Sequence, residues 1–215
     1  MSLKVSNLSL KPDAEFHLDD VSFEMSKGKI YTVIGRTLSG KTTLLKTIAG
    51  LIRPDSGEMS LDGANFGAVP VWKRQVAMVY QQFINYPHLT VYDNVAFPLK
   101  QRKLPMAEID TRVMQALAQV GLQGFENRKI QALSGGQQQR VAIARTLAAK
   151  PALILADEPT GNLDEETADK VMELMMTLAI ETDAALLLVT HSHRLAGRMG
   201  RRLHLRAGQI ERAEE

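Results

Sequence analysis

The stretch "IYTVIGRTLSGKTTLLKTIAG", Ile30 to Gly50, decides the fold. Its first part, "IYTVI", is an apolar run that predicts a buried strand, and "KTTLLKTIAG" predicts a helix ending at Gly50. Between them "GRTLSGKT", Gly35 to Thr42, fits the pattern G-x-x-x-x-G-K-[ST] of a phosphate-binding loop. A strand, this loop and a helix in this order indicate a P-loop nucleoside-triphosphate-binding fold.

The residues of this loop predict how a nucleotide is held. Its glycines let successive backbone N–H groups point inward at the phosphates, and the helix N-terminus adds its dipole. We expect Lys41 to reach the β- and γ-phosphates and Thr42 to ligate Mg²⁺. The expected ATP-binding residues of the loop are Gly35, Arg36, Thr37, Leu38, Ser39, Gly40, Lys41, Thr42 and Thr43.

A second acidic motif complements the loop. The apolar stretch "ALILA", residues 152–156, predicts a strand that delivers Asp157 at its carboxyl end. Ligands of open α/β sheets lie at that end of the strands. We therefore expect Asp157 to hold the Mg²⁺ shell, and Glu158 to orient or deprotonate the attacking water.

The rest of the chain predicts an α/β architecture. Apolar runs at 21–25, 76–80 and 184–189 alternate with helical patterns, which is typical of a mostly parallel sheet covered on both faces. Residues 83–130 do not follow this alternation of apolar runs and helical patterns. They predict a helical insertion, with helices broken at Pro98 and Pro105.

Composition limits the class of protein. The chain has 215 residues, a formal net charge of +2 and no cysteine, so it forms no disulfides or thiolate metal sites. Its N-terminus lacks the apolar core of a signal peptide, and its longest apolar run, "AALLLV", is far too short to span a membrane. We expect a soluble chain whose membrane link, if it has one, runs through a partner.

The motif "LSGGQ", Leu133 to Gln137, predicts a second phosphate site. Ser134 is a good helix N-cap, but Gly135 and Gly136 weaken a first turn. Glycines at this point favour close approach of another molecule, and a serine hydroxyl with free helix N–H groups forms an anion site. We expect this half-site to face the phosphate loop of a second chain, so that a head-to-tail dimer sandwiches two ATP molecules.

With these motifs the chain resembles the nucleotide-binding domain of ATP-binding cassette (ABC) transporters over essentially its whole length. The resemblance implies a P-loop (RecA-like) core with an N-terminal antiparallel β portion and a helical subdomain. It implies one domain, residues 1–215, with a core at about 1–82 and 151–215, a helical subdomain at about 83–150 and no C-terminal regulatory domain. It also assigns roles: Ser134, Gly135, Gly136 and Gln137 to the partner's ATP, Gln81 to Mg²⁺ or the attacking water, Asp164 to the dimer contact, His191 to the γ-phosphate and Phe16 to adenine.

Two parts of the chain resemble different branches of this family. The segment "YPHLTVYDNVAFPLKQRKLPMAEIDTRV" is similar to carbohydrate-importer ATPases. The segments "LILADEPTGNLDEETADKV" and "THSHRLAGRMGRRLHLRAGQI" are similar to lipoprotein-release and macrolide-efflux ATPases. A short natural mosaic, a truncation and a fusion of two sources all remain open.

The resemblance therefore implies an ATPase that drives transport, of the carbohydrate-importer type. Its alternatives are a lipoprotein-release or efflux ATPase, and a soluble ABC ATPase in DNA repair or translation. Expected partners are transmembrane subunits, contacted through the helical subdomain and the Gln81 region, and a second copy or paired ABC domain. No nucleic-acid partner is expected. The expected location is cytoplasmic, peripheral on the inner face of the cell membrane.

Overall fold

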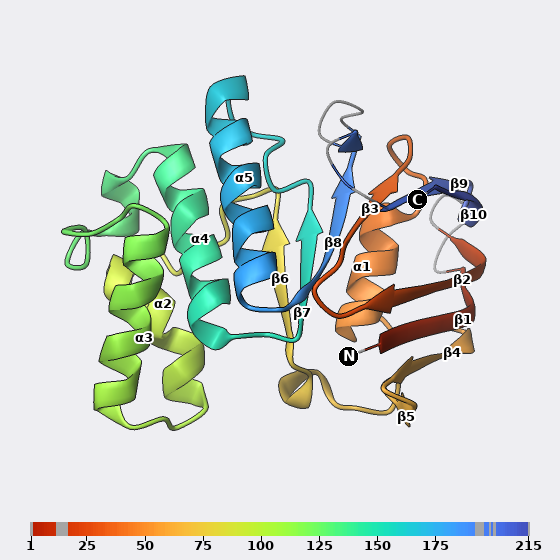
Figure 1. Cartoon of the computed structure of the whole chain (residues 1–215), viewed down its shortest axis with the longest axis horizontal. Coiled ribbons are helices and arrows are strands. Elements are labelled where there is room, and N and C mark those ends of the chain that lie inside the picture. Colours follow the sequence, from red (N-terminus) through yellow and green to blue (C-terminus); the bar gives the residue numbers. More distant parts are fainter. Residues whose placement is uncertain (1, 12–16, 192–195, 198, 200, 215) are drawn as a thin grey trace. The chain divides into compact units, whose positions relative to one another are not determined.

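The computed structural model describes residues 2–11, 17–191, 196–197, 199 and 201–214 (Figure 1). The chain falls into two compact units. Unit 1 comprises Met1–Met78, Ala152–Glu158 and Ala179–Glu215, and unit 2 comprises Val79–Pro151 and Pro159–Leu178. The strands are β1 (Ser2–Leu10), β2 (Leu18–Ser26), β3 (Ile30–Ile34), β4 (Ser56–Leu61), β5 (Ala64–Asn65), β6 (Val76–Tyr80), β7 (Leu153–Asp157), β8 (Ala185–Thr190), β9 (Arg201–Arg206) and β10 (Gln209–Glu214). The helices are α1 (Lys41–Ala49), α2 (Val91–Gln101), α3 (Met106–Gln119), α4 (Gly135–Ala149) and α5 (Glu165–Glu181), with short 3₁₀ turns η1 (Val71–Lys73) and η2 (Ile130–Ala132).

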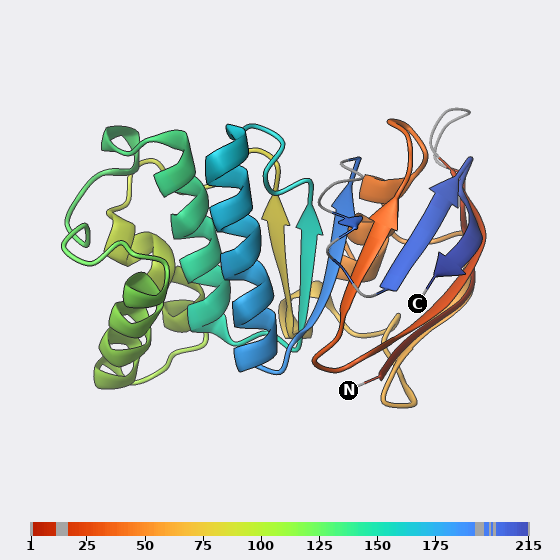
Figure 2. The same cartoon turned by 45° about the horizontal axis from the view of Figure 1, so that its top comes forward.

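A mostly parallel sheet brings the predicted motifs of unit 1 to one edge. Its strand order is β10-β9-β3-β8-β7-β6. β3 pairs in parallel with β8 and with β9, and β8 pairs in parallel with β7 (Figure 2). The carboxyl ends of parallel strands share an edge, so the residues after β3, β7 and β8 lie near one another. These residues are Gly35, Glu158 and His191.

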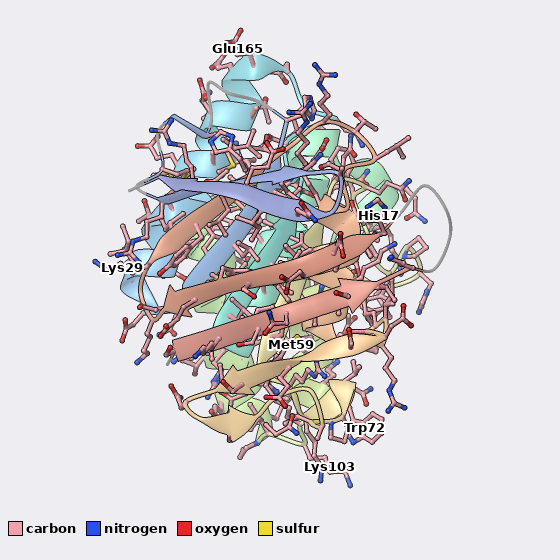
Figure 3. All side chains as sticks on the ribbon, turned by 90° about the vertical axis from the view of Figure 1, so that its right-hand side faces the viewer. His17, Lys29, Met59, Trp72, Lys103 and Glu165 are labelled. Atoms are coloured by element: carbon pink, nitrogen blue, oxygen red, sulfur yellow. The ribbon has the colours of Figure 1, made fainter. Side chains whose placement is uncertain are left out.

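Unit 1 also contains the expected antiparallel sheet, in the order β2-β1-β4-β5 (Figure 3). β1 alternates buried and outward side chains, with a break in register between Val5 and Leu8, where Asn7 has a positive φ of 52°. That bulge returns Leu8 to the buried face. Helix α1 joins the two sheets in one core, because Leu44, Leu45 and Ile48 are fully buried with residues of both.

Unit 2 is built mainly from helices. α2, α3 and α4 pack against one another (Figure 1). Fully buried Asn94 in α2 fixes the segment before that helix: its side chain accepts a hydrogen bond from Tyr86 N and donates to the carbonyls of Tyr86 and Thr90. Among the described residues, every helix is too short or too polar to span a lipid bilayer.

Two details differ from what the sequence led us to expect. Pro98 lies inside α2 and does not break it, because buried residues on both sides of it, Val95 and Leu99, hold the helix in the core of unit 2. Pro105 does separate α2 from α3. The expected helical subdomain, 83–150, lies within unit 2, but residues 159–178, expected in the core, group with unit 2 as well.

Candidate functional site

The phosphate loop joins β3 to α1 as the sequence predicts. Gly40 caps α1 with a φ of 98°, and its carbonyl accepts the first helical hydrogen bond, from Leu44 N at 2.8 Å. A Cβ on Gly40 would lie 2.9 Å from the carbonyl oxygen of His17. Both the left-handed backbone and this close approach require glycine here. Leu38 also lies in the left-handed region, at φ 68°, with its side chain exposed.

Lys41 stands at the first position of α1 and is 5% exposed. Its ammonium donates hydrogen bonds to the carbonyls of Gly35 and Arg36, both at 2.7 Å. Burial lowers the pKa of Lys41, and the carboxylates of Glu158 and Asp157 oppose that shift. The lysine therefore lies beside the acidic motif. Its contact with phosphates remains a prediction.

Thr42 and Asp157 form the pair expected to hold a metal ion. The hydroxyl of Thr42 donates to Oδ1 of Asp157 at 3.0 Å. Asp157 ends β7 and is 9% exposed. Burial raises the pKa of Asp157, against the opposing effect of the Thr42 hydrogen bond. Thr43 lies on the buried side of α1.

Glu158 and His191 form a second pair at the same sheet edge. Oε2 of Glu158 lies 2.9 Å from Nδ1 of His191. An ionised carboxylate only accepts hydrogen bonds, so Nδ1 donates when Glu158 is charged. Glu158 has a positive φ of 47°, and its backbone N–H donates to the carbonyl of Val189 in β8 at 2.9 Å. This bond fixes Glu158 against the strand that leads to His191.

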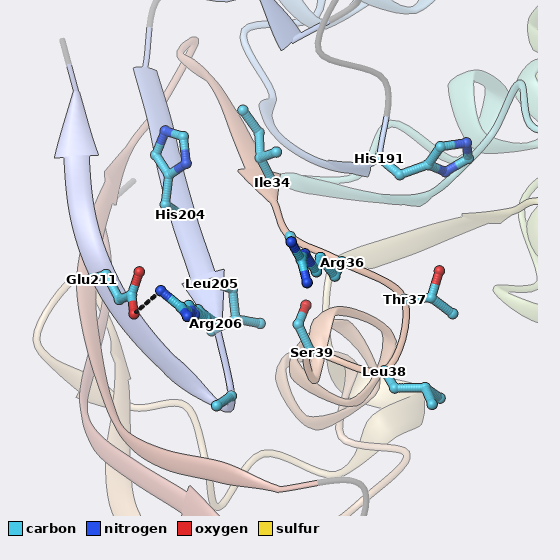
Figure 4. A pocket seen from close by; sticks show the side chains of 12 residues that line it. Ile34, Arg36, Thr37, Leu38, Ser39, His191, His204, Leu205, Arg206 and Glu211 are labelled. Carbon is cyan, nitrogen blue, oxygen red and sulfur yellow. Dashed lines mark ion pairs between the residues drawn. The ribbon is translucent and has the colours of Figure 1, made fainter.

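A cavity of about 840 Å³ opens beside the phosphate loop (Figure 4). The loop residues from Gly35 to Ser39 line one wall, and His191 lies on the side of Thr37. The opposite wall is the β9–β10 hairpin, which sequence reasoning did not assign to a site. Its lining residues are His204, Leu205, Arg206, Ala207 and Glu211. The ion pair between Arg206 and Glu211, at 3.7 Å, is largely exposed and adds little stability.

The signature motif begins helix α4 in unit 2. Ser134 and Gln137 form a reciprocal capping box: Gln137 N donates to Ser134 Oγ at 3.3 Å, and Ser134 N donates to Gln137 Oε1 at 3.0 Å. A Cβ on Gly135 would lie 2.9 Å from Phe83, and one on Gly136 would lie 2.7 Å from Thr167. A Cβ on either glycine would therefore crowd a neighbouring side chain, so packing inside the unit also favours glycine at both positions. The close approach of another molecule to this backbone stays a prediction.

A polar cavity of about 390 Å³ lies at this helix start. Its lining includes five residues expected at the partner's ATP site or the dimer contact, Ser134, Gly135, Gly136, Gln137 and Asp164. It also includes Arg140, Asn162, Leu163 and Thr167, which sequence reasoning missed. Asp164 caps α5, since its Oδ1 accepts a hydrogen bond from Thr167 N at 3.0 Å. That bond lowers the pKa of Asp164. The N-termini of α4 and α5 both border this cavity.

Gln81 follows β6 and is held by Asn162. Asn162 Nδ2 donates to the Gln81 carbonyl at 3.1 Å, and Gln81 Nε2 lies 3.4 Å from Asn162 Oδ1. The roles expected of Gln81 toward Mg²⁺ and water remain predictions. Phe16, the expected adenine contact, lies outside the described residues.

Comparisons with known proteins found a matching family model and several curated relatives. A family model described as ABC transporter matches residues 18–161. The chain is 41% identical over 201 residues to the putrescine transport ATP-binding protein PotG of Escherichia coli (strain K12), covering 94% of this chain and 53% of the relative. It is 42% identical over 203 residues to the molybdate/tungstate import ATP-binding protein WtpC of Thermococcus kodakarensis, covering 94% and 61%. The chain thus spans little more than half the length of these curated relatives.

Solved structures extend the likeness to the fold. A dimeric, post-hydrolysis structure of the ATP-binding cassette MJ0796 bound to ADP and Pi superposes with a TM-score of 0.86 at 34% identity, covering 99% of this chain and 98% of the other. The fold class expected from the sequence is therefore confirmed. The chain belongs to the ABC transporter family and has the fold of its ATP-binding cassettes.

Proposed function

We propose that this chain binds and hydrolyses ATP at the phosphate loop and drives transport through membrane partner subunits. One observation carries the proposal. Two functional pairs, Thr42 with Asp157 and Glu158 with His191, lie at the sheet edge that bears the loop. The first pair suits a metal-bound phosphate, and the second suits activation of water.

The residues of the site fit both expected ligands. The hydroxyl of Ser39 is buried in the loop without a hydrogen-bond partner among the described residues. Arg36 lines the same cavity and favours an anionic ligand, whereas the charge of Arg206 is balanced by Glu211. A threonine hydroxyl and a carboxylate 3.0 Å apart supply the oxygen ligands that Mg²⁺ prefers. Bound there, Mg²⁺ would neutralise charge on the phosphates.

The proposed roles follow from the contacts. Lys41 exchanges its loop carbonyls for phosphate oxygens, which are stronger acceptors for an ammonium. Glu158 accepts the proton of the attacking water. His191 holds the Glu158 carboxylate by its Nδ1 contact and presents the rest of its ring, largely exposed, to the cavity.

The second cavity is proposed to complete the site of a second copy. Its lining by Ser134, Gly135 and Gly136 at a helix start suits phosphate, and the dimeric state of the related cassette supports this arrangement. Gln137 and Asp164 are proposed to line the dimer contact, and Gln81 to reach Mg²⁺ or the attacking water.

The branch of the family is proposed as import, at the inner face of the cell membrane. The printed names of the relatives support import, of putrescine in one case and of molybdate or tungstate in another. These names do not single out carbohydrates, so a carbohydrate cargo stays a prediction from residues 86–113. A lipoprotein-release or efflux ATPase is the alternative, favoured only by the likeness of the C-terminal third.

Phosphate release from Mg-ATP tests the enzymatic part. We expect turnover by the purified chain that EDTA abolishes. Glu158→Gln should lower turnover by about 100-fold or more, because a general base contributes that much, with ATP affinity changed less than about threefold. Exposed Glu173→Gln is the matched control and should keep wild-type turnover. Turnover near the wild-type level in Glu158→Gln would refute the role of Glu158.

A further inference from the structure

Helix α4 carries a buried amide that none of the roles above uses. Gln139 is 0% exposed, in the stripe that also buries Ala142, Ile143 and Thr146. Its Nε2 donates to the carbonyl of Pro159 at 2.6 Å and to that of Tyr80 at 3.2 Å. Its Oε1 is buried without a hydrogen-bond partner among the described residues.

The two carbonyls that accept hydrogen bonds from Gln139 belong to residues directly adjacent in sequence to proposed functional residues. Tyr80 immediately precedes Gln81, and Pro159 immediately follows Glu158. One side chain on the signature helix therefore fixes the backbone beside two of the groups proposed to act on the attacking water.

Further contacts tie the segment after Tyr80 to the same helix. Arg145 Nη2 donates to the Ile84 carbonyl at 2.6 Å, and Asn85 Nδ2 donates to the Gln138 carbonyl at 2.9 Å. Arg145 is half-buried, and this burial lowers its pKa. The segment Tyr80–Asn85 is thus fastened to α4 at both ends, while Gln139 also reaches Pro159.

Packing does not explain the choice of glutamine. A buried amide with an unsatisfied oxygen is costly, and methionine would fill a similar volume in an apolar stripe without that cost. The donor hydrogens are what methionine lacks, and both are committed to backbone carbonyls.

We propose that Gln139 is a positioning residue that couples the signature helix to the backbone beside Gln81 and Glu158. Phosphate bound at the Ser134–Gly136 end of α4 is thereby linked, within the same chain, to the segments that present the water-activating groups. The inference rests on the proposed ATP hydrolysis for its effect on turnover, but its structural part does not.

The test compares the full chain with Gln139→Met, which keeps the volume and removes the donors. Exposed Gln115→Met on α3 is the matched control. Hydrogen exchange is followed at the amides of 80–85 and 160–162, alongside fluorescent-nucleotide binding and turnover. We expect exchange in both segments to quicken by about tenfold as their shared anchor is lost. Turnover should fall by about tenfold or more with ATP affinity changed less than about twofold, the pattern of lost positioning rather than lost binding.

Three results decide the proposal. Unchanged exchange in both segments of a folded Gln139→Met protein would overturn it, whatever the turnover. Equal losses of turnover and ATP affinity would also overturn it, since they indicate general damage. Absence of turnover in the wild type would refute the proposed function and leave the exchange experiment to judge Gln139.

A second variant keeps the proposal testable if Gln139→Met fails to fold. Gln139→Glu retains one donor while its acid is protonated, so its exchange and its turnover, each taken relative to the wild type at the same pH, should lie closer to those of the wild type at pH 6 than at pH 8. A Gln139→Glu protein whose exchange and turnover follow pH just as those of the wild type do would count against the proposal.

Discussion

Replacing Asp157 with asparagine should make the nucleotide-free protein more stable while it removes activity. Asp157 is 9% exposed at the end of β7 and accepts a hydrogen bond from Thr42 at 3.0 Å. Asparagine keeps an oxygen in that place and can keep this bond. What it removes is a buried negative charge, together with its repulsion from Glu158.

The size of the gain in stability follows from the opposing effects of burial and of nearby cations on the Asp157 carboxylate. Burial is the largest influence on the pKa of Asp157, and Lys46 and Lys41 only partly offset it. Lys41, itself buried, loses one compensating charge in the variant. We therefore expect a net stabilisation of about 1 kcal/mol, within the range of single stabilising substitutions at functional sites. In a chain of this size that raises Tm by about 2–4 °C.

The gain should depend on pH in a definite direction. Because the pKa of Asp157 is raised above its usual value of 3.8, the folded protein binds this proton more tightly than the unfolded chain does. The wild type thus loses stability as pH rises from 3.8 through the raised pKa, and Asp157→Asn does not. Its advantage should be largest at neutral pH and shrink toward pH 4.

Thermal unfolding followed by circular dichroism, without nucleotide, at several pH values from 4.5 to 7.5 checks this result. Asp20→Asn is the control, because Asp20 is exposed and also accepts a hydrogen bond, from Asn7 Nδ2. Its Tm should change by less than about 1 °C, as expected for an exposed site. A Tm of Asp157→Asn below that of the wild type at pH 7.5 would refute the reasoning, since it would mean that nearby cations stabilise the charge more than burial penalises it.

The remaining predictions concern the two phosphate half-sites. Gly40→Ala should cost about 1–3 kcal/mol of stability and weaken ATP binding, because the φ of 98° at Gly40 and the nearby His17 carbonyl exclude a Cβ. The control is Leu38→Gly, which relieves left-handed backbone strain and should change stability by less than about 1 kcal/mol. Equal effects of the two substitutions in thermal unfolding would contradict this prediction. Ser134→Arg should block hydrolysis while a single protomer still binds ATP, and loss of binding in fluorescence titration would show that the motif acts within its own chain. His191→Ala should lower turnover by about 10-fold or more with little change in ATP affinity, and wild-type turnover would remove His191 from the mechanism.

Local patterns predicted the elements around the phosphate loop well. Ile30–Ile34 and Val76–Tyr80 are strands at the expected bounds, because apolar runs between turn residues determine buried strands directly. The contact between Thr42 and Asp157 could be predicted for a similar reason. Thr42 comes after the loop that follows β3, Asp157 ends β7, and the carboxyl ends of these parallel strands lie at the same edge of the sheet.

Features that depend on tertiary contacts were not predictable in this way. The β9–β10 hairpin lines the first cavity because β9 pairs with β3, and nothing near His204 or Arg206 in the sequence signals that partner. Pro98 stays helical because burial of its neighbours outweighs its local preference. Gln139 did leave a signal, as a polar residue within an apolar stripe, and that pattern could have identified it.

The central claim is that two copies of this chain complete each other's ATP sites. Light scattering of purified Glu158→Gln protein, first with Mg-ATP and then with Mg-ADP, tests it most directly, because slow turnover preserves the ATP-bound form. We predict a dimer, at twice the 23.8 kDa of one chain, with Mg-ATP and a monomer with Mg-ADP. A monomer under both conditions, with ATP shown to be bound, would contradict the claim that the Ser134–Gly136 half-site of one chain closes over the phosphate loop of another.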